Sequence, residues 1–178
     1  MTPVFARKIS YRAKWGACDG LDEGEIAADA VTLDLKTSGN ELSFWSCSSG
    51  CESELRETVL ALAANCERLD KMDVAWIDEN AVAAEQLTVQ KSPERANTPV
   101  DGLKERHVDI STLDLVRLGK VAALVRAAVS SDRCKRFAKK EVLHVIVEAI
   151  RIGRLNLEAL HAKLREEVQA ELRKLGNP

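Results

Sequence analysis

The chain has 178 residues and a formal net charge of −2, with 46% hydrophobic and 30% charged residues. These proportions are typical of a soluble globular protein and exclude a disordered chain or a membrane protein. Five cysteines, an odd number at irregular spacing, favour free thiols in a reducing compartment over a disulfide framework. No apolar run has the length of a signal peptide or a membrane span, so we expect a cytoplasmic location and no membrane partner.

Charge divides the sequence into two unequal parts. Residues 1–100 hold 10 Lys and Arg against 17 Asp and Glu, whereas residues 101–178 hold 16 against 11. The two parts therefore carry net charges of −7 and +5. Such an asymmetry indicates either two surfaces with different partners or an attraction between the two parts.

Alternation of apolar and polar residues predicts strands in the first third of the chain. Residues 5–15 alternate, with Arg7 as the exception on the apolar side. Residues 26–36 and 42–47 alternate in the same way around the turn residues Ser38–Asn40, so these two segments are expected to pair as a hairpin. The acidic loop at 16–25 is expected to be solvated, because its carboxylates would repel a phosphate group.

The apolar spacing changes to a helical period at about residue 52. Leu55, Val59, Leu62, Cys66 and Leu69 recur at intervals of three and four, which predicts a helix with one buried face that extends to about residue 71. Short strands are predicted at 74–77 and 87–90. The order of these elements favours a mostly antiparallel sheet with a helix packed on one face.

The second part of the chain is predicted to be helical. Residues 92–107 hold two prolines and no apolar periodicity, and we interpret them as a linker between a sheet domain at 1–91 and a basic helical domain at 108–178. Helices are expected at 111–129, 133–152 and 157–175. The predicted fold class is therefore α+β, with a small mostly antiparallel sheet, one packed helix and a three-helix C-terminal part.

The sequence holds few signals of catalysis. Cys47 and Cys51 flank a helix start, where a thiol can be activated, but the next cysteine is 15 residues further on and residues 1–106 contain no histidine. Asp34 and Lys36 form an acid-x-lysine pair of the kind that metal-dependent nucleases use, although the solvated face of a strand accounts for it as well. We therefore predict no catalytic residue, metal or cofactor, and the nuclease stays open as a weaker alternative.

A basic stripe is the best functional signal. If residues 133–154 form one helix, several cations fall on the side opposite a wide apolar arc. An anionic partner could bind there, or the acidic part of the same chain could neutralise it. The predicted anion- or partner-binding residues are Arg133, Arg136, Lys139, Lys140, His144, Arg151 and Arg154.

These observations lead to two hypotheses of different classes. The first is a non-enzymatic protein–protein interaction module, an accessory or adaptor subunit that binds its partner through the helical C-terminal part. The alternative is a nucleic-acid-binding protein, with DNA or RNA held on the basic stripe. The aromatic content of 4% offers few rings for base stacking, which favours the first hypothesis. The sequence leaves the oligomeric state open.

Overall fold

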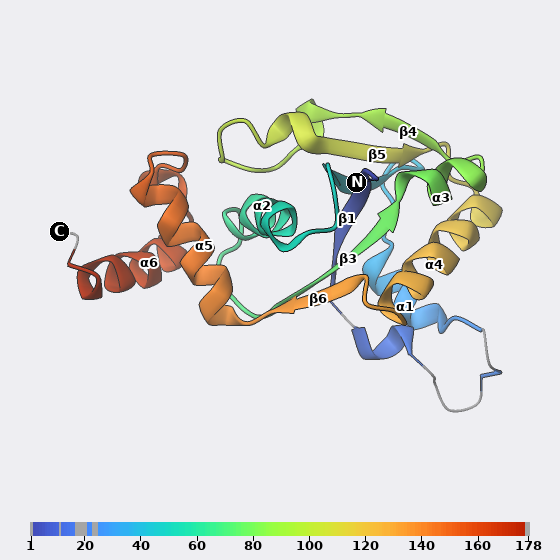
Figure 1. The fold of residues 1–178 in the computed structure, drawn as a ribbon, viewed down its shortest axis with the longest axis horizontal. Coiled ribbons are helices and arrows are strands. Elements are labelled where there is room, and N and C mark those ends of the chain that lie inside the picture. The colour runs from blue at the N-terminus through green and yellow to red at the C-terminus, as the bar shows by residue number, and fades with distance from the viewer. Residues whose placement is uncertain (1, 11, 17–20, 23–24, 177–178) are drawn as a thin grey trace.

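The computed structural model describes residues 2–10, 12–16, 21–22 and 25–176. Its centre is an antiparallel sheet of six strands in the order β4-β5-β2-β1-β3-β6 (Figure 1). The sheet comprises β1 (Val4–Ile9), β2 (Leu42–Cys47), β3 (Met72–Asp78), β4 (Thr88–Lys91), β5 (His107–Ser111) and β6 (Cys134–Phe137).

Helices cover both faces of this sheet. They are α1 (Ala28–Asp34), α2 (Glu52–Ala63), α3 (Glu79–Ala84), α4 (Leu115–Val129), α5 (Lys139–Arg151) and α6 (Ala162–Lys174). On one side α2 lies against the central strands, α5 packs on α2, and α6 packs on α5; α1 and α4 lie on the opposite side (Figure 1). The predicted class, an α+β fold with an antiparallel sheet and C-terminal helices, is confirmed. No described helix is long and apolar enough to cross a bilayer.

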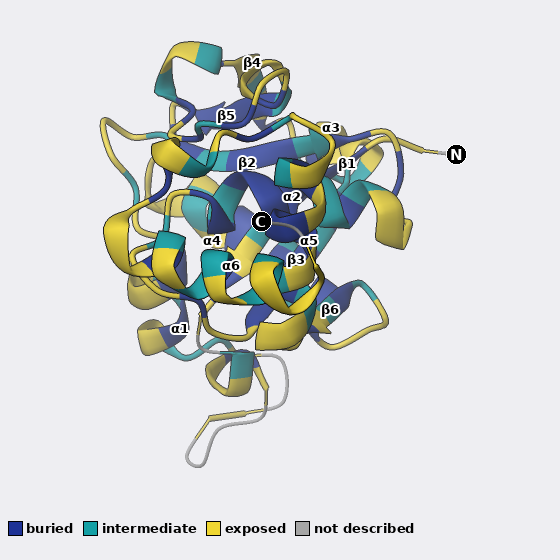
Figure 2. Ribbon diagram, turned by 90° about the vertical axis from the view of Figure 1, so that its left-hand side faces the viewer, coloured by how far each residue is buried: buried dark blue, intermediate teal, exposed yellow. Residues whose placement is uncertain are grey.

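The sheet separates two hydrophobic cores, and strand alternation assigns residues to them. On β1, Val4 and Ala6 point into the core shared with α2 and α5, whereas Phe5 and Ile9 point into the core beneath α4. Figure 2 shows the strands as largely buried, with exposed residues gathered on the outer helices and loops. One packed helix was predicted, but the sheet needs cover on both sides because both its faces are apolar.

Three predicted elements of the first part differ from the structure. Residues 26–36 were predicted as a strand, but α1 is helical, and its buried residues Ala30 and Asp34 lie four positions apart as a helix requires. The predicted hairpin is therefore wrong. The strand predicted at 5–15 ends at Ile9, and a 3₁₀ helix follows at Arg12–Trp15. The α2 helix ends at Ala63, before the predicted end near residue 71. Most of the acidic loop at 16–25 lies outside the described residues.

Two strands from the second part of the chain belong to the same sheet. β5 lies between β4 and β2, and β6 pairs with β3. The predicted linker at 92–107 therefore does not divide the sheet, although it separates the acidic and basic parts of the sequence. The helix predicted at 133–152 is wrong at its start, because Cys134 and Phe137 bury their side chains in opposite cores, as residues three apart on a strand do.

The turn from β2 into α2 is packed closely on β3. Gly50 lies in this turn, and a Cβ atom placed on it would lie 2.3 Å from Nε1 of Trp76. That distance is far below van der Waals contact, so only glycine lets the turn approach the indole ring. This contact fixes the start of α2 relative to the sheet.

We expect Gly50→Ala to lower the free energy of unfolding by about 1–3 kcal/mol, the usual cost of overpacking. Gly119→Ala is the matched control, because Gly119 is in the middle of α4 with no atom within 4 Å of its added methyl group. There alanine should stabilise the helix by about 0.5–1 kcal/mol. Urea unfolding of both variants measures the difference, and a Gly50→Ala protein as stable as the parent would show that the turn is not constrained by Trp76.

Candidate functional site

The predicted basic stripe does not lie on one helix. Arg136 belongs to β6, and Arg133 immediately precedes that strand. The α5 helix begins only at Lys139. Lys140, His144 and Arg151 share α5, while Arg154 follows its end. The break at Ala138 therefore separates the stripe into a strand part and a helix part, which point to different neighbours.

Four of the seven predicted residues form ion pairs with acidic residues of the same chain. Three of the four acids come from the first part of the sequence. The pairs are Arg133 with Asp78 at 2.7 Å, Arg136 with Asp73 at 2.9 Å, Lys139 with Glu167 at 2.7 Å and Arg154 with Glu57 at 2.6 Å. Lys135 is a further example, since it pairs with Glu52. Attraction within the chain thus accounts for much of the charge asymmetry.

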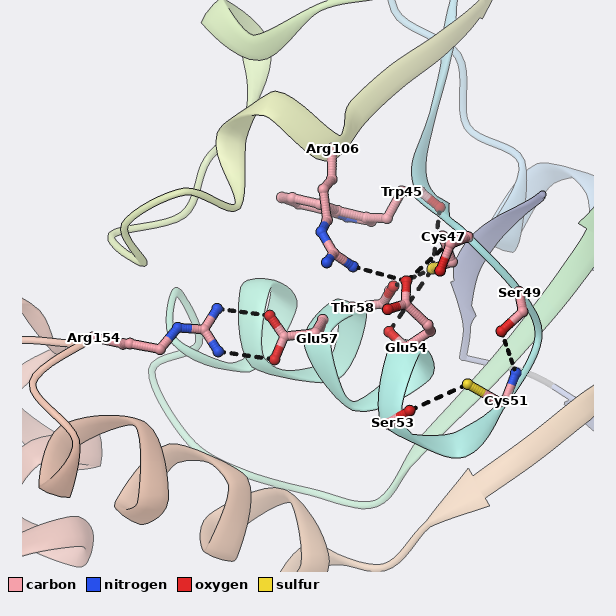
Figure 3. A network of polar contacts seen from close by, with 11 residues as sticks. Trp45, Cys47, Ser49, Cys51, Ser53, Glu54, Glu57, Thr58, Arg106 and Arg154 are labelled. Carbon is pink, nitrogen blue, oxygen red and sulfur yellow. Dashed lines mark hydrogen bonds and ion pairs between the residues drawn. The ribbon is translucent and has the colours of Figure 1, made fainter. Parts of the chain in front are cut away.

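The pair between Arg154 and Glu57 joins the end of α5 to α2. Its two hydrogen bonds run from Nη1 to Oε1 at 2.9 Å and from Nη2 to Oε2 at 2.6 Å, a bidentate geometry (Figure 3). The hydrogen bond from Arg154 holds the pKa of Glu57 below its ordinary value, and the same bond raises the pKa of Arg154. Arg154 is therefore a structural residue that holds α5 against α2.

The remaining cations lie at a groove along α5. Lys140, His144 and Arg151 line it together with Arg56 of α2, Glu171 of α6 and Leu175 just after α6, and its volume is about 590 Å³. Within the described part of the chain, no carboxylate pairs with Lys140 or Arg151. His144 Nε2 lies 3.9 Å from a carboxylate oxygen of Glu148 on the same helix. Leu143 and Val147 give the groove an apolar floor.

The cysteines that flank the start of α2 have different environments (Figure 3). Cys51 is the N-cap of α2 and is exposed, and hydrogen bonds from Ser49, Ser53 and the backbone of Glu54 lower the pKa of its thiol to about 7. Cys47 is buried 3.4 Å from the hydroxyl oxygen of Thr58, and burial raises the pKa of its thiol. The two thiols are thus chemically distinct.

A second polar region went unpredicted because it depends on how β1 and β2 diverge. The two strands pair only from Val4 to Ala6 on β1, although β1 continues along β3 to Ile9 and β2 continues along β5 to Leu42. Arg7 lies at the divergence and donates to the backbone oxygens of Asp34 and Ser43. The only signal in the sequence was Arg7 itself, a charge on the apolar side of an alternating strand.

The acid-x-lysine pair is not an exposed strand face. The Asp34 carboxylate is buried and accepts hydrogen bonds from the Ser10 backbone at 2.7 Å and the Trp15 indole at 2.9 Å, while Lys36 is exposed beyond α1. Asp34 therefore holds the segment after β1 against α1. Across the residues that the structure describes, no three His, Cys, Asp or Glu side chains gather as a metal site requires.

Comparisons with known proteins add no assignment. The chain matches no protein-family model, no curated protein and no solved structure.

The lowered pKa predicts selective reactivity of Cys51. We expect iodoacetamide to alkylate it before Cys47 and Cys134, whose burial raises their pKa values, with a rate that rises as pH passes through about 7, where the thiolate forms. Ser53→Ala removes one stabilising hydrogen bond and should move this rise to higher pH. Peptide mass spectrometry over a pH series measures it, and an unchanged profile in Ser53→Ala would refute the role of that hydroxyl.

Proposed function

We propose that the protein is a non-enzymatic interaction module that binds an acidic amphipathic helix of a partner protein in the groove along α5. The observation that carries the proposal is the unpaired state of Lys140 and Arg151 beside an apolar floor. A cation without an internal partner gains the most from an external carboxylate. An apolar floor between such cations matches a helix that has both leucine-type and acidic residues.

The spacing of the groove residues fits a helical ligand. Lys140, Leu143, Val147 and Arg151 follow one another on α5 at intervals of three and four, so they share one face. A helix of 13 residues is about 20 Å long, which lets a partner helix of about four turns lie along it. Leu175, which follows α6, is 53% exposed and extends the apolar surface at one side.

The paired cations favour a protein partner over nucleic acid. A phosphate backbone is held by several free cations at once, and four of the predicted ones already pair with carboxylates. DNA or RNA remains the alternative, and one experiment distinguishes the two classes.

The test is site-specific crosslinking. We expect a photoreactive benzophenone residue in place of the exposed His144 to form an adduct in cells that express the protein, and protease rather than nuclease should remove it. Mass spectrometry should map the adduct to an acidic segment with apolar residues three and four apart. Adding Lys140→Glu and Arg151→Glu should weaken capture by at least about tenfold, since the loss of two attractive pairs of about 0.5–1 kcal/mol each costs about 1–2 kcal/mol and repulsion adds to that loss.

The matched controls use cations outside the groove. Arg68 and Arg126 also have no ion-pair partner within the described residues, so Arg68→Glu with Arg126→Glu makes the same charge change and should leave capture intact. The crosslinker at position 68 should give no adduct of its own. A nuclease-sensitive adduct would replace the proposal with the nucleic-acid alternative. Adduct yields at 144 no higher than at 68 would reject both.

A further inference from the structure

The divergence of β1 and β2 opens a polar cavity of about 390 Å³. Its lining includes the cations Arg7 and Lys8, the amides of Asn65 and Asn97, and the rings of Trp45 and His107. The volume is within the range of pockets that hold small molecules. Donors and aromatic walls thus converge on one space that no packed side chain fills.

Arg7 brings a positive charge that the described part of the chain does not balance by direct contact. A guanidinium has five N–H groups, and the hydrogen bonds of Arg7 run to the backbone oxygens of Asp34 and Ser43 rather than to a carboxylate. Burial lowers the pKa of Arg7 to about 10, although the nearby charges of Asp34 and Asp109 act to raise it. The group therefore stays charged at neutral pH and keeps N–H groups for a ligand.

Asp34 also lines the cavity and Asp109 lies near Arg7, but other groups engage both carboxylates. Asp34 holds the Ser10 backbone and the Trp15 indole, and Asp109 accepts from the Ser43 hydroxyl at 2.9 Å and pairs with Arg95 at 3.0 Å. Burial by itself would raise the pKa of Asp109, but hydrogen bonds from Ser92, Ser43 and Arg95 hold it below its ordinary value. Both acids thus have fixed partners of their own.

Lys8 completes the donor set. Lys8 is exposed, lines the cavity and has no ion-pair partner among the described residues. Arg7 and Lys8, at adjacent positions of β1, therefore both line the cavity, and each carries a charge that can bind an anion.

His107 contributes a neutral wall. Its Nδ1 lies 2.9 Å from the Ser92 hydroxyl, and its ring meets Trp45 edge to face with centroids 5.3 Å apart. Burial lowers the pKa of His107, so the imidazole adds no charge at neutral pH. The aromatic pair provides a surface for the apolar part of a ligand.

We infer that this cavity binds a small organic anion, whose carboxylate or phosphate group contacts Arg7 and Lys8 while its planar or apolar body lies against Trp45. Asn65 and Asn97 supply amide donors and acceptors for further polar groups of the ligand. The site is separate from the α5 groove, because the two share no lining residue.

The test titrates the full chain with probes of defined chemistry. Benzoate and phenyl phosphate carry an oxyanion on a ring, inorganic phosphate lacks the ring, and benzylamine reverses the charge. We expect saturable binding of at least one aromatic anion, about tenfold tighter than inorganic phosphate, and no binding of benzylamine. Two-dimensional NMR should show the largest shifts at the Trp45 indole and the backbone of residues 7–8 and 43–45.

Variants at exposed positions keep the test independent of folding. Lys8→Gln and Asn97→Ala change exposed side chains, and Lys8→Gln should weaken the aromatic anion by about tenfold through loss of a charge-assisted contact. Arg68→Gln, a matched loss of an exposed cation outside the cavity, should leave affinity unchanged. Absence of saturable binding for both aromatic anions, shifts confined to other residues, or equal losses in Lys8→Gln and Arg68→Gln would each overturn the inference.

Discussion

Burial of both faces of the six-stranded sheet is the constraint on which the other features depend. A sheet covered on both sides has little access to water, so each polar side chain that a strand carries needs a partner inside the protein. Asp109 is fully buried and meets this demand through Ser43 and Arg95. Arg7 has backbone oxygens as partners but no paired carboxylate among the described residues, and β1 and β2 separate at that point.

The same packing brings cations of the second part of the chain next to acids of the first part. Cations of the β6 region and the end of α5 lie beside acids of β3 and α2, because β6 completes the sheet next to β3 and α5 packs on α2. Pairs such as Arg136 with Asp73 join residues 63 positions apart. What looks in the sequence like two oppositely charged regions is thus largely one internally neutralised surface, and among the residues of the predicted basic stripe Lys140 and Arg151 have no acidic partner in the described part of the chain.

The sequence predicted those elements whose buried apolar residues recur at one regular interval, that of a strand or that of a helix. β2, β3 and α4 were found because their apolar residues repeat in a way that only a strand or a helix produces. α1 was missed because Val31, Leu33 and Leu35 alternate by coincidence, while its burial depends on Asp34 binding the distant Ser10 and Trp15. β6 was missed because its cations resemble a solvated helix until their partners on β3 and α2 are known. The cavity depends on where β1 and β2 stop pairing and diverge, and no local pattern encodes it.

The strand order has a consequence for how the chain folds as it is synthesised. The central trio β2-β1-β3 comes from the first 78 residues, so the middle of the sheet can form early. β4 pairs only with β5, so it has no partner strand until residues 107–111 have left the ribosome. β6 pairs with β3 later still, and only then can α5 cover α2 and α6 pack on α5. The growing chain therefore exposes strand edges and apolar surface until these later elements emerge, and such surfaces make an incomplete chain prone to aggregation.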